Sequence, residues 1–152
     1  MLSDKWDLRF MDLAKHIAGW SRDPSTKVGA VAIDSRKRLV ASGFNGLSRR
    51  VEDSPERLHN RTTRYSLTVH AEINMLISAE RSLRGCTVYL WPLPCCSQCA
   101  SALIQAGIAR VVAPAPSPDL ADRWGESIEL AVMAMREAGV KVDILDNTGG
   151  QL

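Results

Sequence analysis

Segments with helical periodicity alternate with short apolar segments along the 152 residues of the chain. Near the start, apolar side chains recur at spacings of three and four, as at Trp6, Phe10 and Leu13, which indicates an amphipathic helix. Shorter apolar or β-branched runs indicate strands. By these criteria the expected helices span residues 4–20, 70–82, 97–105 and 124–138, and the expected strands span residues 27–33, 39–44, 87–90, 110–113 and 141–145.

The order of these segments restricts the fold to one class. A short polar turn at residues 34–38 predicts that the first two strands form an antiparallel hairpin. Helices between the last three strands predict that these strands pair in parallel, with right-handed crossovers. We therefore expect residues 1–152 to form a single α/β domain of three layers, with helices on both faces of a five-stranded mixed sheet. A long polar stretch, rich in arginine, is expected at residues 45–66 to be either a functional loop or partly helical. A rigid proline-rich connection is expected at residues 113–119.

The charge and the cysteines narrow the possible partners. The net charge is +2, which is too weak to predict nucleic-acid binding. The N-terminal segment carries charges throughout, unlike a signal peptide, and no stretch reaches the ~20 apolar residues of a membrane span. Four cysteines without a secretion signal favour metal or thiol chemistry over disulfides. We expect a cytoplasmic protein with no membrane partner and no nucleic-acid partner.

Two short segments carry side chains that bind metals. His70 opens one expected helix, and Cys96 and Cys99 lie at the start of another. Two cysteines three residues apart share one face there, and the positive end of the helix dipole favours their thiolate forms. Zinc in catalytic sites takes three nitrogen, sulfur or oxygen ligands and leaves one position for water. We therefore predict a zinc ion (Zn2+) held by His70, Cys96 and Cys99.

Glu72 lies two residues after the predicted ligand His70. Hydrolytic deamination of an amidine-like ring needs a proton at the ring nitrogen and another at the leaving amine. A carboxylate beside the metal can take a proton from water and deliver it to both sites. A His-x-Glu segment followed by a Pro-Cys-x-x-Cys segment is the pattern of zinc deaminases. We therefore predict Glu72 as the catalytic acid and base.

The sequence leaves other interpretations of these segments open. Cys95 or His59 could supply a fourth ligand, which would make a closed zinc site without catalysis. Cys96 and Cys99 also have the spacing of a redox dithiol, but that interpretation leaves the His-x-Glu segment unexplained. The cysteines could also be ordinary core residues.

The sequence resembles the deoxycytidylate (dCMP) deaminase branch of the cytidine deaminase superfamily. The resemblance rests on the segments STKVGAV, SGFNG, VHAEINMLISA, GCTVYL and CCSQCASALIQAGIARVV, within residues 6–113. It implies the three-layer cytidine-deaminase-like fold, a bound zinc ion, and hydrolysis of dCMP to dUMP and ammonia. It also implies a small-molecule nucleotide substrate and a homo-oligomer.

The resemblance further implies roles for individual residues. The three predicted ligands and the predicted catalytic carboxylate match the family's zinc ligands and proton shuttle. Asn45 matches the asparagine that contacts the sugar hydroxyl, while Val28 and Ala71 match positions that line the base. Lys27 and Arg49 are the expected partners of the phosphate, because such cations bind phosphate and arginine adds a bidentate fork.

Three features depart from the family pattern. The family has a proline directly before its first cysteine, whereas here Cys95 stands between Pro94 and Cys96. Trp91 replaces a small polar residue, and it could either pack in the core or reshape the wall beside the base. The chain after Pro114 does not resemble the usual ending of the family. The alternatives are therefore a modified cytosine nucleotide, a nucleoside, guanine or tRNA adenosine as the substrate, or a non-catalytic zinc module.

Overall fold

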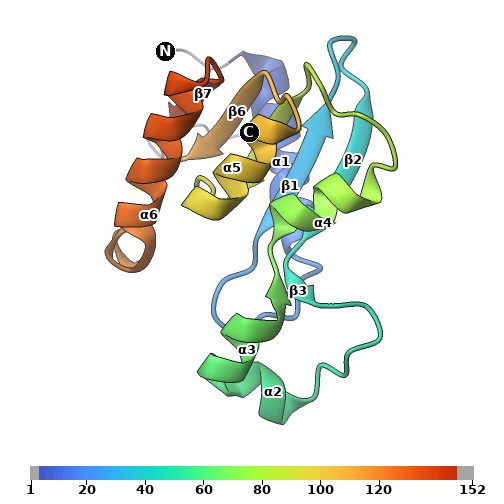
Figure 1. Ribbon diagram of the computed structural model, residues 1–152, viewed down its shortest axis with the longest axis vertical. Helices are drawn as coiled ribbons and strands as arrows, with labels where there is room; N and C mark the ends of the chain where they lie inside the picture. Colours follow the sequence, from blue (N-terminus) through green and yellow to red (C-terminus); the bar gives the residue numbers. More distant parts are fainter. Residues whose placement is uncertain (1–3, 147–152) are drawn as a thin grey trace.

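The computed structural model describes residues 4–146. Its centre is a five-stranded sheet with the strand order β2-β1-β5-β6-β7 (Figure 1). Strand β1 pairs antiparallel with both β2 and β5, whereas β5, β6 and β7 pair in parallel. The predicted mixed sheet is therefore confirmed. Its strands are β1 (Gly29–Ile33), β2 (Leu39–Phe44), β5 (Thr87–Trp91), β6 (Arg110–Pro114) and β7 (Lys141–Leu145).

Helices cover both faces of this sheet, as the sequence predicts. Helix α1 packs on one face, against β1 and β5. On the other face, α4 packs on β2 and β1, and α5 and α6 pack on one another and on the remaining strands (Figure 1). The result is a three-layer α/β domain. The helices are α1 (Lys5–Ala18), α2 (Pro55–His59), α3 (Arg61–Leu67), α4 (Ala71–Ser78), α5 (Ser97–Gln105) and α6 (Pro118–Glu137).

The central strand β1 is buried along its whole length because its side chains alternate between two cores. Val31 and Ile33 pack against α1, whereas Ala30 and Ala32 belong to the core beneath α4 and α5. A strand covered on both faces is expected to be apolar throughout, and β1 reads GAVAI. The helices that open with the predicted ligands therefore pack over small alanines at the centre of the sheet.

Gly43 in β2 allows α4 to lie close to the sheet. A Cβ atom at Gly43 would collide with the carbonyl oxygen of Ala71 and the backbone nitrogen of Met75. Both obstacles are backbone atoms, so no side-chain movement could relieve the collision. Glycine at this position therefore fixes the depth at which α4 presents its first turn, which carries Glu72.

The structure differs from the predicted elements between β2 and α4. Residues 45–66 are partly helical, which is one of the two expected alternatives, but the positions of α2, α3 and the strand β3 (Gly46–Leu47) were not predicted. Strand β3 pairs with β4 (Thr68–Val69) in a separate two-stranded sheet. Polar side chains start both helices: Ser54 caps α2 and Asn60 caps α3. These helices are short and mostly polar, so they lack the apolar periodicity that marks the longer ones.

Two helix boundaries and the proline-rich connection also differ from the prediction. Helix α6 begins at Pro118 rather than at residue 124, because proline suits the first helical position and the Ser117 hydroxyl accepts a hydrogen bond from the Leu120 amide. The rigid connection predicted at residues 113–119 is thereby reduced to residues 115–117, between β6 and α6. Helix α4 ends at Ser78, and the positive φ of Glu80 turns the chain away soon afterwards. Within the described chain, no helix is long and apolar enough to cross a membrane.

A buried polar network joins α1 to β5, β6 and β7. The Asp7 carboxylate accepts hydrogen bonds from the Tyr89 hydroxyl at 2.7 Å and from both terminal nitrogens of Arg110 at 2.8 and 2.9 Å. Arg110 also contacts Asp143 at 2.7 Å. Burial alone would raise the pKa of Asp7, but the bonds from Arg110 and Tyr89 outweigh it and lower the pKa below its ordinary value.

Candidate metal centre and active site

The three predicted ligands meet at the starts of α4 and α5. His70 is the N-cap residue of α4, Cys96 is the N-cap residue of α5, and Cys99 lies in the first turn of α5. The Nδ1 atom of His70 is 3.5 Å from the Cys96 Sγ and 3.3 Å from the Cys99 Sγ. All three ligand atoms lie within 4.8 Å of one another. One ion could therefore contact all three side chains.

The other candidate ligands point elsewhere. Cys95 is buried, and its Sγ lies 4.0 Å from the Sδ of Met135 in the core. His59 is exposed, and its Nδ1 lies 2.8 Å from the carbonyl oxygen of Pro55. Among residues 4–146, His70, Cys96 and Cys99 form the one gathered set of three histidine, cysteine or acidic side chains. A set of one imidazole and two thiolates fits zinc, and three ligands leave a coordination position open.

The charges at the three ligands also suit a divalent cation. The hydrogen bond from the Cys99 thiol, helped by His70, lowers the pKa of Cys96 to about 4. The same bond raises the pKa of Cys99, because this thiol keeps the proton that it donates, and burial raises the pKa further. The contact with Cys96 raises the pKa of His70. A bound cation would favour the thiolate form of both cysteines.

Glu72 lies beside these ligands in a position that suits proton transfer. It is 4% exposed, and this burial raises the pKa of its carboxyl above the ordinary value. A backbone hydrogen bond, the charge of His70 and a hydrogen bond with Cys99 lower this pKa but do not outweigh burial. A buried carboxyl with a raised pKa exchanges protons more readily near neutral pH than an exposed one.

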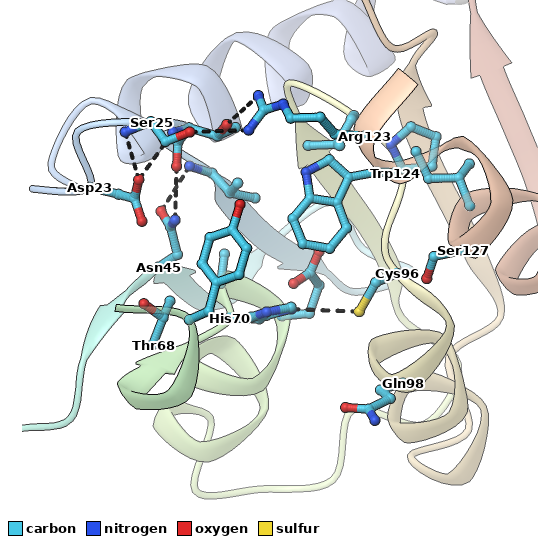
Figure 2. Close-up of a pocket in the computed structure, with 18 of the residues that line it drawn as sticks. Asp23, Ser25, Asn45, Thr68, His70, Cys96, Gln98, Arg123, Trp124 and Ser127 are labelled. Carbon is cyan, nitrogen blue, oxygen red and sulfur yellow. Dashed lines mark hydrogen bonds between the residues drawn. The ribbon is translucent and has the colours of Figure 1, made fainter. Parts of the chain in front are cut away.

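A cavity of about 350 Å³ opens from these residues toward α6. His70 and Cys96 lie at one end, and Ser25 and Arg123 lie at the opposite edge (Figure 2). Glu72 also lines this cavity. Apolar and aromatic side chains form much of the remaining wall, with a few hydroxyl and amide groups among them, as is typical of small-molecule sites. Other residues that line the cavity are Asp23, Thr26, Val28, Asn45, Tyr65, Ala71 and Trp124.

The predicted substrate-binding residues divide into two groups. Val28, Asn45 and Ala71 line the cavity. Lys27 and Arg49 do not line it, and both are exposed. Lys27 lies between Thr26 and Val28, which both line the cavity. These two cations are therefore not on the wall where a phosphate was expected to meet them.

Asn45 holds one wall of the cavity together. Its Oδ1 accepts a hydrogen bond from the Val28 amide at 2.9 Å, and its Nδ2 donates to the Thr26 carbonyl at 2.9 Å. The Ser21 hydroxyl donates to the Asn45 carbonyl at 2.8 Å. One N–H and one lone pair of the Asn45 amide are not used by these bonds, so the side chain can still contact a ligand.

Two features of the site were not predicted from the sequence. Arg123 on α6 is the one cationic side chain, apart from His70, that lines the cavity within the described chain. Beside it, Trp124 meets Tyr65 with ring centroids 6.3 Å apart. The capping residue Ser117 and Pro118 could have predicted the correct start of this helix. With that start, Arg123 and Trp124 belong to its second turn. Trp91, by contrast, packs on the α1 side of the sheet with Lys15 over its ring, so it does not reshape the cavity wall.

Comparison with known proteins assigns the family. The pattern of the cytidine and deoxycytidylate deaminase zinc-binding region matches residues 4–115, which include all three ligands and Glu72. The chain belongs to this family. It is a zinc-dependent deaminase whose sixth helix lies beyond the matched region.

Relatives of this deaminase agree with the assignment. It is 41% identical over 138 residues to an uncharacterized deaminase in the luxG 3' region of Aliivibrio fischeri, covering 91% of this chain and 92% of the other. It is 33% identical over 114 residues to human deoxycytidylate deaminase, covering 71% of this chain and 64% of the human protein. The chain therefore spans less than two thirds of the human relative.

Solved structures confirm the fold of the deaminase. The dCMP deaminase of cyanophage S-TIM5, solved in complex with dCMP and dUMP, superposes with a TM-score of 0.74 at 20% identity, covering 95% of this chain and 100% of the other. A guanine deaminase from Nitrosomonas europaea superposes with a TM-score of 0.57 at 19% identity, covering 95% of this chain and 78% of the other. The cytidine-deaminase-like fold predicted from the sequence is therefore confirmed.

Proposed function

We propose that this enzyme hydrolyses a cytosine nucleotide, and specifically dCMP, to the uracil nucleotide and ammonia. The observation that carries the proposal is the buried carboxyl of Glu72, which lines the same cavity as His70 and Cys96. Human deoxycytidylate deaminase is among the relatives, and the S-TIM5 enzyme binds dCMP and dUMP in its crystal. We also propose that the enzyme acts in the cytoplasm on a free nucleotide.

The proposed chemistry assigns separate tasks to the ligands and to Glu72. His70, Cys96 and Cys99 would hold zinc, which as a Lewis acid would activate a water molecule. Glu72 would accept a proton from the attacking water and deliver protons to the ring nitrogen and to the departing amine. The raised pKa of Glu72 suits this exchange, because the group must both gain and lose a proton in each cycle.

The cavity wall supports a ring-shaped substrate with a sugar attached. Val28 and Ala71 would contact the base, because both line the cavity. Asn45 would contact the sugar with the N–H and the lone pair that its bonds to Thr26 and Val28 leave unused. Tyr65 and Trp124 add aromatic surface to the cavity wall, on which a planar ring can stack.

We propose a homo-oligomer as the working assembly, as the family resemblance implies. Three exposed apolar side chains support a protein contact: Trp20 is 55% exposed, Phe44 is 38% exposed and Ile77 is 68% exposed. Trp20 and Phe44 meet edge to face, with centroids 6.1 Å apart. Sedimentation equilibrium of the zinc-loaded protein tests this proposal, and a strictly monomeric species would contradict it.

A substrate panel tests the proposed reaction. Zinc-loaded enzyme is incubated with dCMP, CMP, deoxycytidine, cytosine, guanine and an adenosine-containing tRNA, and ammonia and product are quantified. The expected result is that dCMP has the highest kcat/KM. Deamination of guanine or of tRNA, without reaction of any cytosine compound, would contradict the proposal. The chain would still belong to the deaminase family, but its substrate would not be a cytosine compound.

A further inference from the structure

The edge of the cavity opposite the metal ligands carries a compact group of donors. Arg123 donates from Nη1 to the Ser25 hydroxyl and from Nη2 to the Thr26 hydroxyl, both at 3.1 Å. All three side chains line the cavity. Figure 2 shows Arg123 and Ser25 at the edge that faces away from His70 and Cys96, with Asn45 between the two ends.

The geometry of these bonds leaves donors for an anion. Each hydroxyl accepts its hydrogen bond from the guanidinium and therefore keeps its own O–H to donate. The bonds to Ser25, Thr26 and Asp119 use three of the five N–H groups of Arg123. The N–H of Nε, one N–H of Nη1 and the two hydroxyls remain as donors, and such charge-assisted and hydroxyl donors bind phosphate oxygens.

Two acidic side chains near Arg123, those of Asp23 and Asp119, have partners or solvent that reduce their repulsion of an anion. Asp23 lines the cavity, but its Oδ1 accepts from the amides of Ser25 and Thr26 at 2.8 and 3.0 Å. Its Oδ2 lies 3.7 Å from the buried guanidinium of Arg64. Asp119 pairs with Arg123 at 3.0 Å, but its side chain is 79% exposed, so solvent screens this pair. Arg123 therefore retains attraction for an anion inside the cavity.

We propose that Arg123, Ser25 and Thr26 form a subsite for the phosphate of a nucleoside monophosphate, and that this subsite selects nucleotides over nucleosides. The proposal rests on the proposed deaminase function and names how the same cavity chooses its substrate. Arg123 lies on α6, outside the matched residues 4–115, so the selection would depend on a helix that the family pattern does not cover. From the metal to this edge, the order of the wall residues then follows base, sugar and phosphate.

Binding of unreactive ligands tests the subsite without relying on catalysis. Isothermal titration calorimetry on zinc-loaded protein compares dUMP with deoxyuridine, and dGMP with deoxyguanosine. The expected result for the natural sequence is that at least one monophosphate binds roughly 10- to 100-fold more tightly than its nucleoside, as charge-assisted hydrogen bonds imply. Arg123→Gln is expected to remove this difference, while binding of the nucleoside stays unchanged.

Two further variants keep the test specific. Arg123→Lys retains the charge but cannot hold both hydroxyls through one planar group, and it should keep only part of the preference. Arg136→Gln removes an arginine from the same helix whose Nη2 contacts the Val142 carbonyl, away from the cavity, and it should keep the full preference. Zinc content and melting temperature are measured for each variant, so that a folding defect is recognised.

The outcomes separate this inference from the proposed reaction. One outcome is that dGMP binds more tightly than deoxyguanosine in a way that depends on Arg123, while dUMP and deoxyuridine bind equally. This outcome would support the subsite and contradict the cytosine substrate. Equal affinity for nucleoside and monophosphate would overturn the subsite, whether or not cytosine compounds are deaminated. The subsite would also be overturned if Arg123→Gln retains zinc but loses the same factor in affinity for the nucleoside and for the monophosphate.

Discussion

The Nδ1 atom of His70 lies 3.3 Å from the Sγ atom of Cys99, although 29 residues separate the two in the chain. This contact exists because α4 and α5 cover the same face of the sheet and present their first turns to one another. The ligand set is therefore complete only in the folded chain. Metal binding and folding are expected to be thermodynamically linked as a result.

Replacement of single cysteines tests which thiols hold the metal. Cys96→Ala and Cys99→Ala should each lose zinc, because two protein ligands no longer define the site. Cys95→Ala should keep about one zinc per chain and lose only the packing of a small core side chain against Met135, at a cost of about 1 kcal/mol. Zinc per chain is measured after gel filtration by atomic emission. Loss of zinc in Cys95→Ala alone would show that the ligand register is wrong.

Asn45 is expected to stabilise the cavity wall as well as contact the substrate. Asn45→Ala leaves the Val28 amide and the Thr26 carbonyl without their side-chain partner, which should lower the free energy of unfolding by about 1–3 kcal/mol. Urea denaturation of the zinc-loaded protein measures the change. An unfolding free energy equal to that of the natural sequence would mean that water replaces both bonds without cost.

The Asp7 network predicts a specific response to acid. A carboxyl whose pKa is lower in the folded state than in the unfolded state binds fewer protons when folded, so it stabilises the fold at higher pH. This stabilisation is complete above the unfolded pKa near 3.8 and is lost as the pH falls through the lower folded pKa. Asp7→Asn removes the titrating group, so its stability should fall less steeply than that of the natural sequence below pH ~4.

Melting temperatures between pH 3 and 7 test the Asp7 prediction. Loss of zinc at low pH affects both proteins, so the difference between the two curves is the relevant quantity. Parallel curves for the natural sequence and Asp7→Asn would contradict the proposed linkage.

Much of the fold was predictable because its signals are local. The apolar run of β1 and the periodic spacing in α1 follow directly from burial on two faces and on one face respectively. The zinc ligands were predictable because each lies at a helix start within a short motif. The positions of the helices α2 and α3 were not predicted, because these helices begin at polar caps, Ser54 and Asn60, and have no apolar stripe.

The substrate wall was harder to predict because it is assembled from distant segments. Lys27 and Arg49 were attractive phosphate partners by charge alone, yet their side chains are exposed and outside the cavity. Arg123 lies about a hundred residues further along the chain than Ser25 and Thr26, to which it donates. A tertiary contact of this kind leaves no spacing in the sequence, and α6 could be placed over the cavity only once the fold was known.

The most direct test of the central claim compares Glu72→Gln with the natural sequence, both with verified zinc. Deamination of dCMP is followed by chromatography of dUMP, and Glu129→Gln serves as the matched control because Glu129 is exposed on α6. We predict that Glu72→Gln retains zinc but loses about 10²- to 10⁴-fold in kcat, while Glu129→Gln is unaffected. An unchanged rate in zinc-loaded Glu72→Gln would contradict the assignment of Glu72 as the group that moves protons in this site.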